Sequence, residues 1–414
     1  MSREHIRSRL FQELSIKNEV NVEGVAADPA IFQHLDLGGA HQEQVHLCFE
    51  MDHETHEGFD LPTGYITPGG LRVAFHWDSR SDFRIVYDSG EYVLTHKGKE
   101  LFPVTFDKRP AYYGLEASDG TPFSRIAGYS SGYLDGGTVS IAYSNECSLK
   151  EKGQDCLFCN INATKDTYSE IQGIKWKNPR QIGEAVAAAY RLDGVTHTNL
   201  TGGFVPERRE VDYYIDVAEA IQESTGLQDF NGTAVIGAPL DLGIIDRYKE
   251  AGFRTLAMNL EMWDPAFYAA ILPGKVAECG GREHWIKAIE YAAKVFGKGK
   301  VRSGFVAGIE PKRATLEGVE YFASIGVLSL TGAWTPNPGS ALEGHRTPHA
   351  EWHLDVAYKC HDIFKRYGFT YQDYFDIAPS PNFLIHDLFA IDEERVPAFG
   401  GDKREQPVQG DRIA

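Results

Sequence analysis

The chain has 414 residues, a formal net charge of −18 and 42% hydrophobic residues, the composition of a folded protein with a large core. The acidic balance argues against nucleic acid and anionic membranes as general partners, so we expect neither. The first residues lack the apolar core of a secretory signal peptide, and no apolar run is long enough to cross a bilayer. We therefore predict a cytoplasmic protein whose thiols stay reduced.

The first 130 residues differ from the rest of the chain in composition and in the pattern of apolar residues. A charged, helical opening is followed by segments rich in glycine and proline. Residues 83–106 alternate apolar and polar side chains and contain two turn signals, DSG and HKG. This alternation predicts a small antiparallel β element. We expect an N-terminal α+β extension over residues 1–130, a barrel domain over 131–390 and a polar tail over 391–414.

From about residue 137, short β-branched strands alternate with longer amphipathic helices. Regular alternation predicts a parallel sheet with helices outside. At least six such units favour an α/β fold of the complete or partial (β/α) TIM-barrel type, in which chemistry takes place at the C-terminal ends of the strands. The predicted strands cover residues 138–144, 197–202, 233–238, 254–261, 301–310 and 327–336, with 371–378 as a candidate seventh.

Three of the six cysteines, Cys147, Cys156 and Cys159, lie within thirteen residues in the pattern C-x8-C-x2-C, directly after the first predicted barrel strand. In a reducing compartment such a group indicates metal binding rather than disulfides. An iron–sulfur cluster usually takes four thiolates, so three would leave one iron open to another ligand. The alternative is a structural zinc site completed by a histidine, although no histidine lies between His96 and His197. The cysteines alone leave both interpretations open.

The cysteine segment resembles the radical S-adenosylmethionine (SAM) superfamily, and its biotin-synthase-like group in particular, whose signature is three cysteines after the first barrel strand. The first gap in that signature is commonly three residues, and the gap of eight here is a departure. Phe158 matches the aromatic residue that contacts the adenine of SAM. Four more strand ends resemble the family's SAM contacts, in chain order: Gly202 and Gly203 in NLTGGFV, Asn259 and Glu261 in MNLE, Gly308 in SGFVAGIEP, and Pro338 and Gly339 in TPNPGSALEG.

The resemblance implies one 4Fe–4S cluster on Cys147, Cys156 and Cys159, with SAM as the second cofactor. Reductive cleavage of SAM would give a 5′-deoxyadenosyl radical that abstracts hydrogen from a small molecule. The reaction would be a lyase, rearrangement, dehydrogenation or cyclisation step in cofactor or natural-product biosynthesis. An electron donor such as flavodoxin or ferredoxin is also implied. Two alternatives stay open: a radical SAM enzyme that modifies a peptide or protein, and a non-enzymatic, zinc-stabilised barrel that binds a ligand.

Biotin synthase itself carries a second cluster, and the corresponding positions here hold Leu200, Thr233 and Arg302. None of these side chains can donate a thiolate, so sulfur insertion is not expected. The remaining cysteines share no spacing that would build another cluster, and we interpret them as structural thiols: Cys48, Cys279 and Cys360. The sequence does not identify a catalytic side chain or a substrate.

Overall fold

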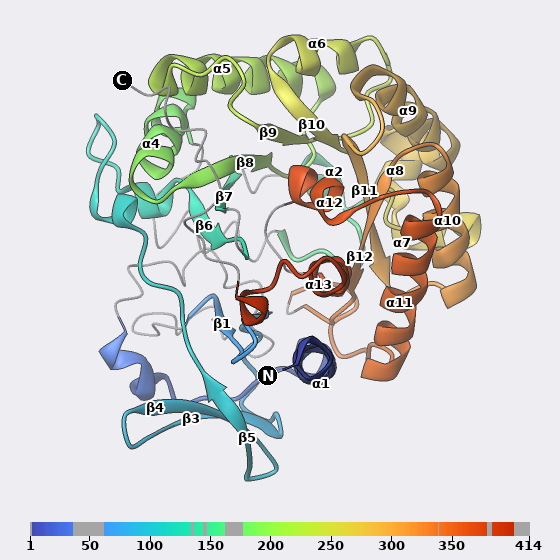
Figure 1. Ribbon diagram of the computed structural model, residues 1–414. Helices are drawn as coiled ribbons and strands as arrows, with labels where there is room; N and C mark the ends of the chain where they lie inside the picture. Colours follow the sequence, from blue (N-terminus) through green and yellow to red (C-terminus); the bar gives the residue numbers. More distant parts are fainter. Residues whose placement is uncertain are drawn as a thin grey trace.

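The computed structural model describes residues 2–35, 62–133, 136–143, 147–161, 177–337, 339–378 and 383–400. Its centre is a curled sheet of seven strands with helices along the outer face (Figure 1). The strands are β6 (Gly128–Ser131), β7 (Gly137–Ala142), β8 (Val195–Thr201), β9 (Gly232–Val235), β10 (Phe253–Ala257), β11 (Val301–Ala307) and β12 (Leu328–Ala333).

The strand order is β12-β11-β10-β9-β8-β7-β6, so strands that follow each other in the chain are neighbours in the sheet. The six strands from β7 to β12 are parallel, and β6 joins β7 antiparallel at one edge. Among the described strands, β6 and β12 do not pair with each other. The predicted barrel is therefore confirmed in its partial form.

The longer helices follow the predicted alternation, and they bury an apolar face. In α4, for example, Asn178 and Gln181 form a capping box at the start, and the alanine-rich face is buried. The helices after β7 are α2 (Ser148–Glu151), α4 (Pro179–Leu192), α5 (Glu207–Thr225), α6 (Ile244–Glu250), α7 (Pro265–Ile271), α8 (Pro273–Glu278), α9 (Gly281–Phe296), α10 (Lys312–Ser324), α11 (Ala350–Arg366), α12 (Tyr371–Ile377) and α13 (Leu384–Asp392).

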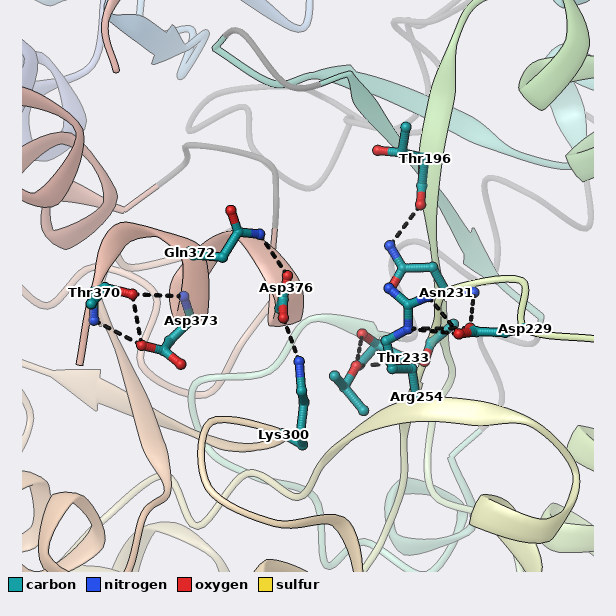
Figure 2. Close-up of polar contacts among 12 residues, drawn as sticks. Thr196, Asp229, Asn231, Thr233, Arg254, Lys300, Thr370, Gln372, Asp373 and Asp376 are labelled. Carbon is teal, nitrogen blue, oxygen red and sulfur yellow. Dashed lines mark hydrogen bonds and ion pairs between the residues drawn. The ribbon is translucent and has the colours of Figure 1, made fainter. Parts of the chain in front are cut away.

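The seventh strand predicted at 371–378 is wrong, because these residues form α12. Thr370 and Asp373 make a capping box that starts a helix in spite of the aromatic, strand-like composition. The helix closes the N-terminal end of the barrel: the Tyr374 hydroxyl donates to the Ser329 carbonyl at 3.0 Å. Figure 2 shows this end, with Lys300 at the start of β11 paired to Asp376 of α12.

The N-terminal residues form α1 (Arg3–Glu23), the hairpin β1 (Gly64–Ile66) and β2 (Arg72–Ala74), and a three-stranded antiparallel sheet. That sheet confirms the β element predicted at 83–106. Its strands are β3 (Phe83–Asp88), β4 (Glu91–His96) and β5 (Lys99–Val104). Short 3-10 helices lie at Pro29–His34, Ala111–Gly114, Phe123–Arg125 and Pro397–Phe399.

Helix α1 joins two hydrophobic clusters. Leu10 and Leu14 belong to the large cluster around the barrel, whereas Val20 packs with the residues of the antiparallel sheet. Between them, the fully buried Lys17 forms an ion pair of 2.8 Å with Asp387 of α13. The extension is thus anchored to the barrel by apolar contacts and one buried ion pair.

None of the helices in the described ranges has the length and apolar character that a bilayer crossing requires.

Candidate functional site

The cysteine segment lies at the C-terminal end of β7, the rim at which a barrel carries its chemistry. Cys147 stands just before α2, and the backbone N–H of Cys159 donates to the Cys156 carbonyl at 2.9 Å in the turn that follows. Burial raises the pKa of Cys156 to about 12, and the nearby thiols of Cys159 and Cys147 act in the same direction. The three predicted thiols are therefore gathered at one place.

Three neighbouring loops hold this segment through backbone hydrogen bonds. Ser148 donates to the carbonyl of Phe204 after β8 at 2.9 Å, and Leu157 donates to the carbonyl of Ile271 in α7 at 3.0 Å. Leu342, in the loop after β12, donates to the Leu157 carbonyl at 3.1 Å. The loops after β7, β8, β10 and β12 consequently meet around the cysteines.

Asn259 and Glu261 lie beyond the end of β10, which is shorter than the strand predicted at 254–261. The chain turns here, since Glu261 has a φ of 74°, a conformation rare for a residue other than glycine. Such strained residues are concentrated at functional sites. The Asn259 side-chain oxygen accepts a hydrogen bond from the Gly304 N–H at 2.9 Å.

Lys275 of α8 was not identified from the sequence, yet it contacts both Asn259 and Glu261. Its Nζ donates to the Asn259 carbonyl at 2.8 Å, lies 3.4 Å from Glu261 Oε1 and stands 4.3 Å from the centre of the Trp285 ring. Its positive charge lowers the pKa of Cys156 and so partly offsets the rise caused by burial. The sequence around Lys275 contains no motif that indicates a functional role. Only the folded structure brings α8 beside the cysteines.

A cavity of about 260 Å³ opens beside these residues, at the inner face of the barrel. Three predicted site residues line it, namely Phe158, Asn259 and Glu261, together with Arg302. Val306, Leu330, Trp334 and Phe383 contribute apolar surface to the wall, and Thr335 and Asn337 contribute polar groups.

A second cavity, of about 270 Å³, adjoins the first and lies between the barrel and the N-terminal extension. Asn18 of α1 and Arg72 of β2 line its outer part. The two cavities share Gly332, Ala333, Thr335, Asn337 and Phe383 in their walls.

The predicted glycines do not line either cavity, and two have packing reasons for their identity. A Cβ at Gly202 would lie 2.4 Å from the Tyr143 ring, and Gly203 beside it is buried. Gly308 has a φ of 113°, which favours glycine. The Gly339 N–H donates to the Glu343 carboxylate at 2.8 Å. Pro338 lies outside the described residues.

The barrel interior is polar where biotin synthase would carry further cysteines. Thr233 bonds to the His197 ring at 2.9 Å inside the barrel, and Arg302 bonds to Asn199 at 3.0 Å across it. On β8, Asn199 rather than Leu200 therefore points inward, since neighbouring strand residues face opposite sides. Cys279 and Cys360 are buried, as a structural role predicts, and Cys48 lies outside the described residues.

Within the described ranges, no group of three histidine, cysteine or acidic side chains converges on one ion position. The thiols of Cys147, Cys156 and Cys159 are nonetheless close enough to influence one another. Three neighbouring thiols are the donor chemistry of an iron–sulfur cluster, so the residues present fit such a group.

Comparisons with known proteins relate the chain to one superfamily. A family model described as the radical SAM superfamily matches residues 142–314. The bacteriochlorophyllide c C-7(1)-hydroxylase of Chlorobaculum limnaeum is 27% identical over 309 residues, which are 70% of this chain and 71% of that protein. Methylornithine synthase (PylB) matches 66% of this chain and 79% of its own, at 16% identity and a TM-score of 0.44. HydG, a maturase of the FeFe-hydrogenase, matches 59% and 55%, at 15% identity and a TM-score of 0.42.

Proposed function

Because this chain belongs to the radical SAM superfamily, and is an enzyme whose cofactors are a 4Fe–4S cluster and SAM, we propose that Cys147, Cys156 and Cys159 are the cluster ligands. When bound, the reduced cluster supplies the electron that cleaves SAM into methionine and a 5′-deoxyadenosyl radical, which removes a hydrogen atom from the substrate. The observation that carries the proposal is the convergence of four strand-end loops on the three cysteines.

The neighbouring residues then bind SAM. Phe158 offers an aromatic face to the adenine, and Asn259 and Glu261 offer polar groups at the cavity wall. Lys275 is a positioning residue, because it holds the Asn259 carbonyl and the Glu261 carboxylate. The remaining proposed contacts come from the resemblance alone: Gly202, Gly203, Gly308, Pro338 and Gly339.

The substrate that we propose is a small molecule, held in the cavity of about 260 Å³ between Phe158 and Phe383. Apolar walls with a few polar groups are typical of small-molecule sites. The walls also keep water from a radical intermediate. A lyase, rearrangement, dehydrogenation or cyclisation reaction remains the leading group of outcomes.

A second candidate is hydroxylation of a bacteriochlorophyllide-type compound, the activity that the name of the Chlorobaculum limnaeum relative gives. The adjoining cavities favour it, since together they extend the site from Arg302 to Arg72 and so offer room for a larger substrate. We further propose a cytoplasmic enzyme with an electron donor such as flavodoxin or ferredoxin.

The test is anaerobic reconstitution of the full chain with iron and sulfide, followed by reduction, addition of SAM and assay for 5′-deoxyadenosine. We expect about four irons per chain and release of 5′-deoxyadenosine. Bound zinc without a cluster and without SAM cleavage would contradict the proposal and favour the zinc-stabilised barrel. Each candidate substrate is then added to ask which one is consumed together with SAM.

A further inference from the structure

Arg302 lies on the inner face of β11 and is one of the residues that line the barrel cavity. Its Nη2 donates to the side-chain oxygen of Asn199 at 3.0 Å. Its Nε is buried and has no hydrogen-bond partner among the described residues. The guanidinium, which offers five N–H donors, is therefore only partly satisfied by the chain around it.

Two histidines near this guanidinium, His197 and His386, are uncharged at neutral pH. Burial lowers the pKa of His197 to about 3 and that of His386 to about 3, and the charge of Arg302 acts in the same direction on both. Burial also lowers the pKa of Arg302 itself to about 10, and no described carboxylate offsets this effect.

Two other partly buried arginines are each paired with an acid. Arg72 forms an ion pair with Asp107, and Arg254 forms one with Asp229. Glu261, an acid in the wall of the same cavity as Arg302, is engaged by Lys275 at 3.4 Å. A buried charge without a partner is costly, so the site is electrostatically incomplete until an anion enters it.

We propose that Arg302, oriented by Asn199, binds a carboxylate group of the substrate inside the barrel. This inference rests on the proposed function and deepens it, since it names the substrate class as a carboxylic acid with an apolar body. The single positive charge of Arg302 matches the single charge of a carboxylate, whereas a phosphate carries up to two negative charges. The apolar walls formed by Leu330, Trp334 and Phe383 would hold the remainder of the molecule.

The anchoring has a consequence for catalysis. A carboxylate fixed at Arg302 leaves the substrate few orientations within a cavity of about 260 Å³. The carbon that loses hydrogen would then lie at a constant distance from the SAM side of the cavity, where Phe158 and Asn259 stand. Positioning of this kind decides which of several similar C–H bonds reacts.

The experiment compares matched probes on the reconstituted, SAM-bound enzyme without reductant. Binding of 3-phenylpropionate, its amide 3-phenylpropanamide and phenyl phosphate is measured by calorimetry at constant ionic strength. We expect the wild type to bind the acid at least about tenfold more tightly than the amide, as loss of a charge-assisted hydrogen bond predicts. Arg302→Gln should abolish this preference, and Arg302→Lys should retain part of it.

Three results would overturn the inference. They are equal binding of acid and amide by the wild type, an unchanged preference in Arg302→Gln, and tighter binding of phenyl phosphate than of the acid. Thermal unfolding and iron content of each variant show whether it is folded and loaded. Release of 5′-deoxyadenosine by the wild type is measured after a reductant is added to the same preparations. Its absence would contradict the proposed function, whereas its presence without acid preference contradicts only the role of Arg302.

Discussion

The side-chain oxygen of Asn259 accepts a hydrogen bond from the backbone N–H of Gly304, at 2.9 Å. The contact joins the segment after β10 to the middle of β11 at the cavity wall. A Cβ at position 304 would lie 3.0 Å from the Asn259 side chain, so the glycine allows this close approach. Asn259 thus has a structural bond in addition to the SAM contact proposed for it.

Replacing Asn259 should separate these two roles. Asn259→Ala removes the acceptor, and we expect a loss of about 1 kcal/mol in the free energy of unfolding, because the Gly304 N–H loses its partner. Asn259→Asp keeps an acceptor oxygen and should retain most of that stability. Urea denaturation measures the first effect, and equilibrium dialysis with SAM should show weaker binding to Asn259→Ala. Equal stability of the alanine variant and the wild type would contradict the structural role.

The cluster ligands are tested by iron content. Cys147→Ala, Cys156→Ala and Cys159→Ala should each lose most of the bound iron and all release of 5′-deoxyadenosine, because two thiolates cannot hold the cluster. Cys279→Ala is the matched control. This buried thiol lies close enough to Cys147 that Cys147 contributes to its raised pKa. Full iron content is expected in this control, and its loss would add Cys279 to the ligands.

The strands and the site were predictable to different degrees. The β-branched strands and amphipathic helices determine local structure by their periodicity, and the six parallel strands were predicted for that reason. The motif at Asn259 and Glu261 was found through its resemblance to the family's SAM contacts. The role proposed for Arg302 was not predicted, because its contact with Asn199 spans 103 positions and depends on the curl of the sheet.

Local capping explains the main error in the predicted fold. Residues 371–378 have the aromatic content of a strand, but the capping box of Thr370 and Asp373 favours a helix. The antiparallel β6 and the contribution of Lys275 were missed because both depend on tertiary contacts. Contacts between distant segments have no local signature in one sequence.

The ion pair between Lys17 and Asp387 should carry much of the docking of α1. Both side chains are buried, and their charged groups lie 2.8 Å apart. Lys17→Met leaves the Asp387 charge without this partner, and Asp387→Leu does the reverse, so each should cost about 3–5 kcal/mol of unfolding free energy. The double variant should lose less than the sum of the two. Additive losses in chemical denaturation would show that the pair is not coupled.

The buried histidines should make the protein less stable in acid. His197 and His386 are 0% and 2% exposed, and burial lowers the pKa of each from 6.5 to about 3. Below pH 6.5 each of these histidines is protonated in the unfolded chain. In the folded chain each stays neutral until about pH 3. Each histidine therefore lowers the free energy of unfolding by roughly 2 kcal/mol between neutral pH and pH 5.

Buried acids with a raised pKa, such as Asp387, also make the stability depend on pH. Replacing one histidine isolates the contribution of that histidine. His197→Gln retains a polar group toward Thr233 but does not titrate. Its stability relative to the wild type should improve by roughly 2 kcal/mol as the pH falls from 7.5 to 5, because only the wild type refuses the proton. Urea unfolding at the two pH values gives this difference. A difference that does not change with pH would mean that His197 accepts a proton in the folded barrel.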